Sequence, residues 1–155
     1  MKLQSAMEYL MTYGWAILLL GIVLASLYAL GLFSPSSFIQ STCLLQANFG
    51  CINAYLSSSG KLTVNIEQNT ESPINITSIG CNTNATYYNM VSISPPLSLP
   101  IGSNHTFTIQ CYQGTQQYSG QIGSIFKGYL LFNYTSLQTG FQNTQIGTLM
   151  LKVSS

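Results

Sequence analysis

The feature that most constrains the fold is a long run without charge, since residues 9–60 contain no Asp, Glu, Lys or Arg. Within it, residues 10–33 are mostly apolar, and at about 1.5 Å per helical residue they are long enough to span about 30 Å of hydrocarbon. A cleaved secretory signal would have a shorter apolar core followed by a small-residue cleavage site. We therefore predict a hydrophobic helix that inserts into a membrane.

A single carboxylate, Glu8, lies at the head of this helix, with only Lys2 nearby as a basic side chain. An ionised carboxylate near hydrocarbon costs roughly 2.5–3.5 kcal/mol on insertion scales, so such a residue indicates a functional position that needs a counter-charge. A plain single-pass anchor explains the helix length and its interfacial aromatic residues but gives no reason for Glu8. We expect its partner to be a free N-terminal amine, created by cutting the chain just before the helix and supplied by a neighbouring subunit.

The residues around Glu8 carry a family resemblance. The stretch from Lys2 to Leu10, Lys-Leu-Gln-Ser-Ala-Met-Glu-Tyr-Leu, resembles the class III signal peptide of archaeal type IV pilins. In that family the cut precedes a Gln and leaves a Glu as the fifth residue of the mature chain. The resemblance therefore implies cleavage between Leu3 and Gln4, although Leu3 stands where the family usually has Gly or another small residue. Gln4 and Glu8 then become the register pair between subunits.

Small residues recur at every fourth position of the helix, at Gly21, Ala25 and Ala29. This spacing lets helix backbones approach closely where lipid removes the hydrophobic driving force, and we interpret it as a helix-packing face. Small residues are also common in membrane helices generally, so the row alone does not require an interface.

The helix should end near Gly31 to Ser34, because Gly terminates helices well and Pro35 moves the residue before it out of the α region. The predicted organisation is a leader of residues 1–3, a transmembrane and filament-core helix of residues 4–33, a neck of residues 34–37 and a head of residues 38–155.

Alternating apolar and polar residues predict short strands in the head. Strands are expected around residues 62–67, 106–111, 129–134 and 149–153, with a loosely formed one around residues 52–56. Turns are expected at Gly114, Gly120, Gly123, Gly128, Gly140 and the Pro95-Pro96 pair. The predicted fold class is α+β, with the hydrophobic helix followed by an antiparallel β-sandwich of immunoglobulin-like outline.

Four cysteines, Cys43, Cys51, Cys81 and Cys111, all fall in the head. Their even number and extracytoplasmic position favour disulfides. Of the three possible connectivities we favour Cys43–Cys51, which closes a short loop, together with Cys81–Cys111. The cysteines form no C-x-x-C pair and the chain has one His, His105, which we interpret as a solvated polar residue, so no metal or haem site is expected.

The charged residues of the head favour neither catalysis nor nucleic-acid binding. The chain has no Asp and no Arg, and its carboxylates outside the helix are Glu67 and Glu71, from which no catalytic arrangement can be assembled. Lys61, Lys127 and Lys152 form no basic patch in the sequence. We expect no enzymatic activity, no cofactor and no nucleic-acid partner.

Four Asn-x-Ser/Thr tripeptides begin at Asn75, Asn84, Asn104 and Asn133, and each would present a glycan acceptor outside the membrane. So short a motif also arises by chance in a chain rich in Asn, Ser and Thr. Asn133 is the weakest candidate, because it lies in the densest strand pattern.

The resemblance implies a structural subunit of a surface filament, with adhesion as the expected role. A membrane-inserted precursor would be cut by a prepilin peptidase and assembled by an ATPase and a membrane platform into a helical homopolymer, with the helices inside and the heads outside. An archaellin of a rotating filament is structurally close. The alternative from another class is a bitopic cell-surface protein whose head binds a ligand such as a sugar, and such an anchor would tolerate the loss of Glu8.

Overall fold

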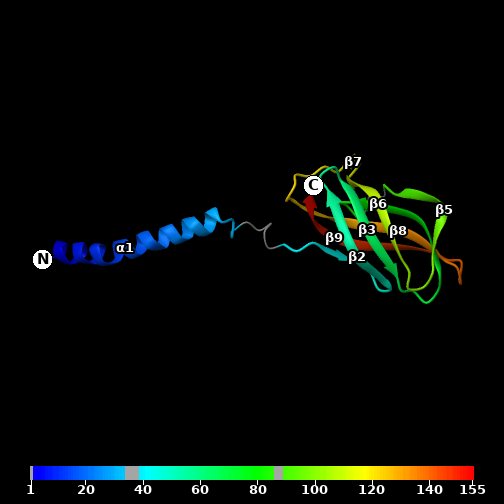
Figure 1. The fold of residues 1–155 in the computed structure, drawn as a ribbon, viewed down its shortest axis with the longest axis horizontal. Helices are drawn as coiled ribbons and strands as arrows, with labels where there is room; N and C mark the ends of the chain where they lie inside the picture. Colours follow the sequence, from blue (N-terminus) through cyan, green and yellow to red (C-terminus); the bar gives the residue numbers. More distant parts are fainter. Residues whose placement is uncertain (1, 34–38, 86–88) are drawn as a thin grey trace. The chain divides into compact units, whose positions relative to one another are not determined.

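The computed structural model describes residues 2–33, 39–85 and 89–155 (Figure 1). The chain divides into two compact units, Met1–Ile39 and Gln40–Ser155, which are a helical unit and a β-rich head. The predicted neck of residues 34–37 lies outside the described residues.

Helix α1 spans Lys2–Ala29 and ends as its glycine predicts (Figure 1). The N–H of Leu32 donates to the carbonyl oxygen of Leu27 at 3.2 Å, and the N–H of Gly31 donates to that of Tyr28 at 3.0 Å. Together with the φ of 71° at Gly31, these bonds form a Schellman motif, which satisfies carbonyls at the helix end. Among the described residues one helix is long and apolar enough to cross a membrane, Leu3–Ala29, with a mean hydropathy of 2.1.

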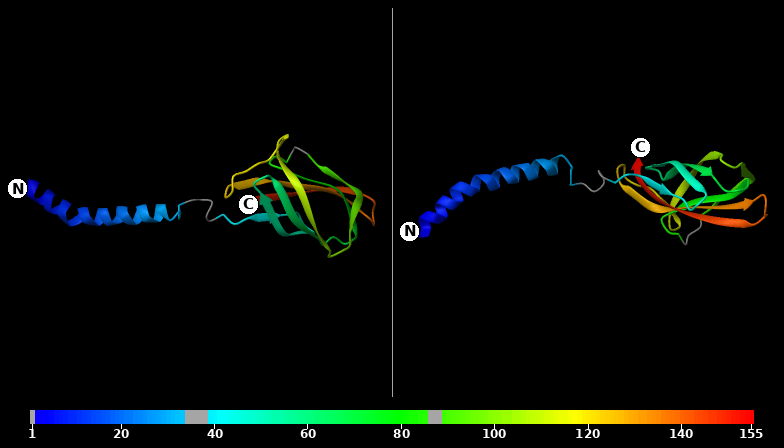
Figure 2. Two further views of the ribbon diagram at one scale, coloured as in Figure 1. Left: turned by 45° about the horizontal axis from the view of Figure 1, so that its top comes forward. Right: turned by 90° about the horizontal axis from the view of Figure 1, so that it is seen from below.

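The described residues of the head form a nine-stranded sheet (Figures 1 and 2). The strands are β1 (Thr42–Leu44), β2 (Phe49–Ser57), β3 (Lys61–Gln68), β4 (Ile74–Asn82), β5 (Val91–Leu99), β6 (Asn104–Gln113), β7 (Gln116–Gln117), β8 (Ile125–Ser136) and β9 (Gln142–Ser154). They follow the order β5-β4-β8-β9-β2-β3-β6-β7, with β1 added on β9 and a further pairing between β4 and β6. Strands β4, β8, β9, β2, β3 and β6 thereby close a six-stranded ring.

Two short parallel pairings close this ring. Leu56 and Ser57 of β2 pair with the C-terminal end of β9, and Cys81 and Asn82 of β4 pair with β6. The other pairings among the described residues are antiparallel. The prediction of a helix followed by an antiparallel β-rich domain is confirmed. The head is, however, a six-stranded barrel and not clearly a sandwich, because backbone hydrogen bonding continues through the two parallel pairings that join the strands into a ring.

Along each strand of the barrel, residues that face the interior alternate with residues that face outward, and the inward-facing residues form the core. The buried rows include Leu62, Val64 and Ile66 of β3, Phe107, Ile109 and Cys111 of β6, and Leu149, Leu151 and Val153 of β9. These are the rows that the sequence periodicity predicts. Strand β2 is longer than the loosely formed strand expected at residues 52–56, since it is paired with β3 over most of its length.

Two predicted turns are wrong, because Pro95-Pro96 lies within β5 and Gly128 lies within β8. Strand β5 stands at the edge of the strand order, where a residue without a backbone N–H is tolerated. Gly128 faces the interior, and a Cβ there would lie 2.6 Å from Cζ of Phe126 and 2.8 Å from the carbonyl oxygen of Asn82. This glycine allows close packing inside a strand instead of a turn.

The side chain of Asn82 links the end of β4 to the turn that follows β6, at one of the two parallel pairings. Its side chain is 1% exposed. Its Nδ2 donates to the carbonyl oxygen of Gly114 at 2.9 Å, while its Oδ1 accepts from the N–H of Gly114 at 3.2 Å and from the N–H of Asn84 at 3.0 Å. The disulfide Cys81–Cys111 crosses the same pair of strands. Covalent and hydrogen bonding therefore act together where the ring closes.

We expect Asn82→Ala to lower the free energy of unfolding by about 2–4 kcal/mol, because the N–H groups of Gly114 and Asn84 lose their side-chain acceptor. The carbonyl oxygen of Gly114 keeps a second donor, Nδ2 of Asn89 at 3.1 Å. Chemical denaturation of the purified, non-reduced chain in detergent measures this. The control is Asn53→Ala, an exposed asparagine of β2, which should change stability by less than about 0.5 kcal/mol. Equal stability of the two variants would show that the Asn82 bonds do not hold the corner.

Candidate assembly site on the N-terminal helix

Helix α1 presents apolar side chains to its surroundings along its whole length. Leu10, Ile17, Leu20 and Ile22 are each more than half exposed, and none of the most apolar stretch of the helix is buried within the chain. A contiguous apolar surface of this size indicates contact with lipid or with another protein surface.

Gln4 and Glu8 lie one turn apart on this helix and both are exposed. Residues four apart on a helix are neighbours, with their Cβ atoms about 5–6 Å from each other. The bond predicted to be cut, between Leu3 and Gln4, lies in the first turn of α1, where backbone N–H groups have no helical partner and the turn is easiest to unwind. Cutting it would turn the backbone nitrogen of Gln4 into a cationic amine.

The turn that carries Glu8 is braced by its neighbours. The rings of Tyr9 and Tyr13 lie with centroids 4.6 Å apart, and the hydroxyl of Thr12 donates to the carbonyl oxygen of Glu8 at 2.8 Å. The side-chain carboxylate of Glu8 is exposed and can meet a group from another chain.

The predicted packing row of Gly21, Ala25 and Ala29 lies on one exposed face of α1. Gly14, which the four-residue spacing did not reveal, belongs to the same face, because a seven-residue step on a straight helix returns to within about 20°. Apart from the adjoining residues and the backbone of the helix itself, no heavy atom lies within 4 Å of a Cβ built at Gly14 or Gly21. The backbone is therefore open to close approach over two further turns, and the seven-residue spacing is the signal that would have found it.

The carboxylate and the small-residue face point in different directions. Glu8 precedes Gly21 by thirteen residues, which at 3.6 residues per turn places the two about 140° apart around the helix axis. A partner that supplies a charge to Glu8 and a partner that packs on Gly21 would therefore be two different neighbours.

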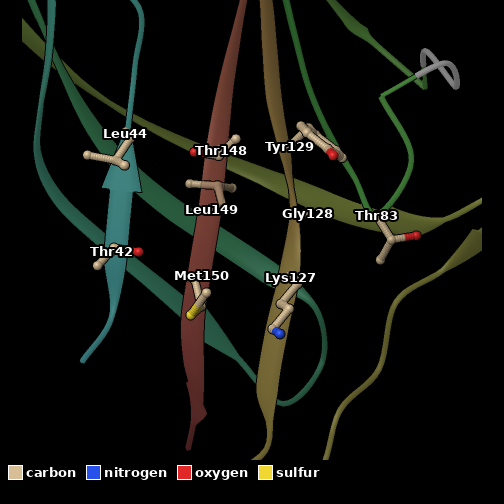
Figure 3. A pocket seen from close by; sticks show the side chains of 9 residues that line it. All are labelled: Thr42, Leu44, Thr83, Lys127, Gly128, Tyr129, Thr148, Leu149 and Met150. Atoms are coloured by element: carbon tan, nitrogen blue, oxygen red, sulfur yellow. The ribbon is translucent and has the colours of Figure 1, made fainter. Parts of the chain in front are cut away.

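The head carries a groove of about 330 Å³ on the outer surface of β1, β8 and β9 (Figure 3). Its lining residues are Thr42, Leu44, Thr83, Lys127, Gly128, Tyr129, Thr148, Leu149 and Met150. This volume is at the small end of the range for ligand pockets. Among the residues that the structure describes, no three His, Cys, Asp or Glu side chains gather as metal ligands would.

Both disulfides have the connectivity that the sequence favours. Cys43 is bonded to Cys51 and Cys81 to Cys111, with Cα–Cα distances of 5.9 and 4.5 Å. The second bridge is buried in the core, whereas the first joins β1 to β2 and is half-buried. Two such bridges suggest an extracellular environment.

The four predicted glycan acceptors differ in accessibility. Asn84 and Asn104 are exposed, whereas Asn75 is half-buried in β4. The Nδ2 of Asn133 donates to Oγ of Ser78 at 3.1 Å, and its Oδ1 accepts from the hydroxyl of Thr144 at 2.7 Å. The geometry therefore favours Asn84 and Asn104 as acceptors. Thr86, which completes the tripeptide that begins at Asn84, lies outside the described residues.

No protein-family model and no curated protein matches the chain. A proposal about its function therefore depends on the residues described above.

Bulk on the small-residue face should hinder helix packing. If the chain forms the filaments that the resemblance implies, we expect Gly21→Leu to leave membrane insertion and both disulfides intact but to lower the yield of sheared filaments by about tenfold. Gly21→Ala, which adds one methyl group, should have a smaller effect, and Val23→Leu on the opposite face serves as the matched control. Wild-type yield from Gly21→Leu would exclude this face as an interface.

Proposed function

We propose that the chain is a type IV pilin-like structural subunit of an archaeal surface filament, made as a membrane-inserted precursor, cut before Gln4 and assembled through α1. The observation that carries the proposal is the exposed Glu8 at the head of an apolar helix whose residues are mostly exposed. A prepilin peptidase and a pilus assembly machinery are the implied partners, and adhesion is the proposed role.

The physical reason begins with the two ways in which the helix can be covered. In the precursor, lipid surrounds the apolar side chains of α1, and Glu8 remains near the polar boundary because burial in hydrocarbon is costly. In a bundle of α1 helices the same side chains are covered by one another. The new amine at Gln4 of one subunit then neutralises Glu8 of another and sets the axial register between them.

The two-sided character of α1 supports a polymer instead of a closed pair. Because Glu8 and the Gly21 face lie on different sides of the helix, each subunit would use unlike surfaces to bind unlike neighbours. Contacts of this heterologous kind extend without limit unless the rotation between subunits closes a ring. A helical homopolymer is the assembly that such contacts produce.

The properties of the head fit a position outside the cell. Its ring closes by hydrogen bonding at two corners, its two disulfides tolerate an oxidising environment, and its described surface carries few charges. We propose that the heads form the outer surface of the filament, with Asn84 and Asn104 as their glycan acceptors.

The second candidate is a bitopic cell-surface protein whose head binds a ligand in the groove of β1, β8 and β9. The groove joins an aromatic ring, Tyr129, to hydroxyl groups and to the amine of Lys127, a combination that suits a sugar (Figure 3). This candidate explains the groove but assigns no role to Glu8.

Processing is the first test of the proposal. Mass spectrometry of subunits from purified filaments should find a peptide that begins at Gln4 and keeps its free amine, since cyclisation to pyroglutamate would remove the charge that pairs with Glu8. Filaments built from subunits that keep Met1 would contradict both the cut and the amine partner of Glu8.

Glu8→Gln separates the two candidates. The substitution removes a charge whose insertion costs roughly 2.5–3.5 kcal/mol, so membrane insertion should be undiminished while filament assembly falls by about tenfold or more. Glu8→Asp keeps the charge and should retain part of the assembly. Wild-type filament yield from Glu8→Gln would favour the bitopic receptor.

A further inference from the structure

The charged side chains of the head are segregated between its two ends. The head contains five, Lys61, Glu67, Glu71, Lys127 and Lys152. Lys61 begins β3, Lys127 lies near the start of β8 and Lys152 near the end of β9, whereas Glu67 lies near the end of β3 and Glu71 in the β3–β4 loop. Because β8 and β9 are antiparallel, and β2 ends beside both the start of β3 and the end of β9, the three lysines share the end that holds the C-terminus and the two glutamates share the opposite end. The strands that run between these two ends are drawn in Figures 1 and 2. We call these the lysine end and the glutamate end.

The lysine end is where the chain arrives from the helix. The backbone N–H of Lys152 donates to the hydroxyl of Ser41 at 3.1 Å. Lys127 pairs with Met150 in the β8–β9 register, so Lys127 and Lys152 are diagonal neighbours about 7–8 Å apart on the outer face. Lys61 begins β3 at the same end, and all three lysines are exposed.

The glutamate end carries negative charge, and it lies too far from Lys61 for the two charges to pair within one head. Glu67 is the penultimate residue of β3, and Glu71 is exposed in the loop that follows. Six residues of strand separate Lys61 from Glu67, which at about 3.3 Å per residue is about 20 Å. Each end therefore presents an unbalanced charge to its surroundings.

Exposed apolar side chains accompany the charges. At the glutamate end, Ile101, Leu137 and Phe141 are 57%, 52% and 73% exposed. Backbone bonds hold these turns to the β3–β4 segment, from the N–H of Gly102 to Gln68 and from the N–H of Leu137 to Pro73. At the lysine end, Ile122 is 67% exposed in a loop whose Gly123 donates to the carbonyl oxygen of Val153. Both ends thus combine charge with apolar surface on a hydrogen-bonded scaffold.

We propose that the two ends of the head bind one another in successive copies of this chain, the glutamate end of one head against the lysine end of the next. The contact is heterologous, so one head uses both ends and the arrangement repeats along a filament. Opposite charges select this order and reject contacts between like ends, while the apolar residues are covered at the junction. The inference rests on the proposed function and adds a second, outer set of contacts to those between the helices.

An anionic membrane surface is the competing occupant of the lysine end, because this end is the one tethered to the helix. Lipid headgroups would attract the lysines but leave the glutamates, Ile101, Leu137 and Phe141 without a role. A second copy of the head accounts for both ends, and for this reason we favour it.

Charge reversal with rescue tests the contact in filaments of the full chain. The first variant is Lys127→Glu with Lys152→Glu, the second is Glu67→Lys with Glu71→Lys, and the third combines all four and keeps the native net charge. We expect the first two to assemble about tenfold less at low salt and the third to return to within about twofold of wild type. Thr108→Lys, at an exposed position in the middle of β6, is the control for added charge and should assemble normally.

The possible results separate the explanations. A defect in the first variant that the third does not rescue would show that the lysines act on lipid, and normal assembly of both reversed variants would exclude the contact. A wild-type chain that forms no filament overturns the proposed function itself, and the inference with it.

A measurement without any variant guards against misfolding. Between about 0.1 M and 1 M salt the Debye length falls from about 10 to 3 Å, so wild-type filaments should become shorter or more easily sheared. Filaments indifferent to salt would overturn the proposal. Peptide mapping of both disulfides confirms that each reversed variant is folded.

Discussion

The constraint on which this protein depends is that the apolar surface of α1 must be covered by something other than water. Most residues of α1 are exposed from Leu3 onward. A membrane or another protein surface can supply this cover. The carboxylate of Glu8 distinguishes the two, because a carboxylate is costly in hydrocarbon and is stabilised where a positive charge lies nearby.

The fold of the head satisfies a different constraint, which is that every strand edge needs a hydrogen-bonding partner or protection from pairing with another chain. Short parallel pairings join β2 to β9 and β4 to β6, so the main strands form a ring. The buried disulfide Cys81–Cys111 and the amide of Asn82 reinforce one of these joints. Strand β5 remains outside the ring, and its two prolines reduce its capacity to pair further.

Because charged residues are scarce, five side chains determine how charge is distributed over the head. Three lysines lie at one end of the head and two glutamates at the other, so the two ends have opposite charge although the net charge of the head is close to zero. Individual surface ion pairs contribute little to stability. A contact repeated in every subunit of a polymer depends more on the order and orientation that complementary charge selects than on the strength of one pair.

The sequence by itself determined the features that depend on local chemistry. Hydrophobic length predicted α1, Gly31 predicted its end, and two-residue alternation predicted the buried row of Leu62, Val64 and Ile66. Tertiary structure alone decided the closed ring, the placement of Pro95 and Gly128 inside strands, the hydrogen bonds that occupy Asn133, and the segregation of lysines from glutamates. These depend on which distant strands become neighbours, and that choice comes from packing and backbone pairing across the whole head, which a local pattern does not contain.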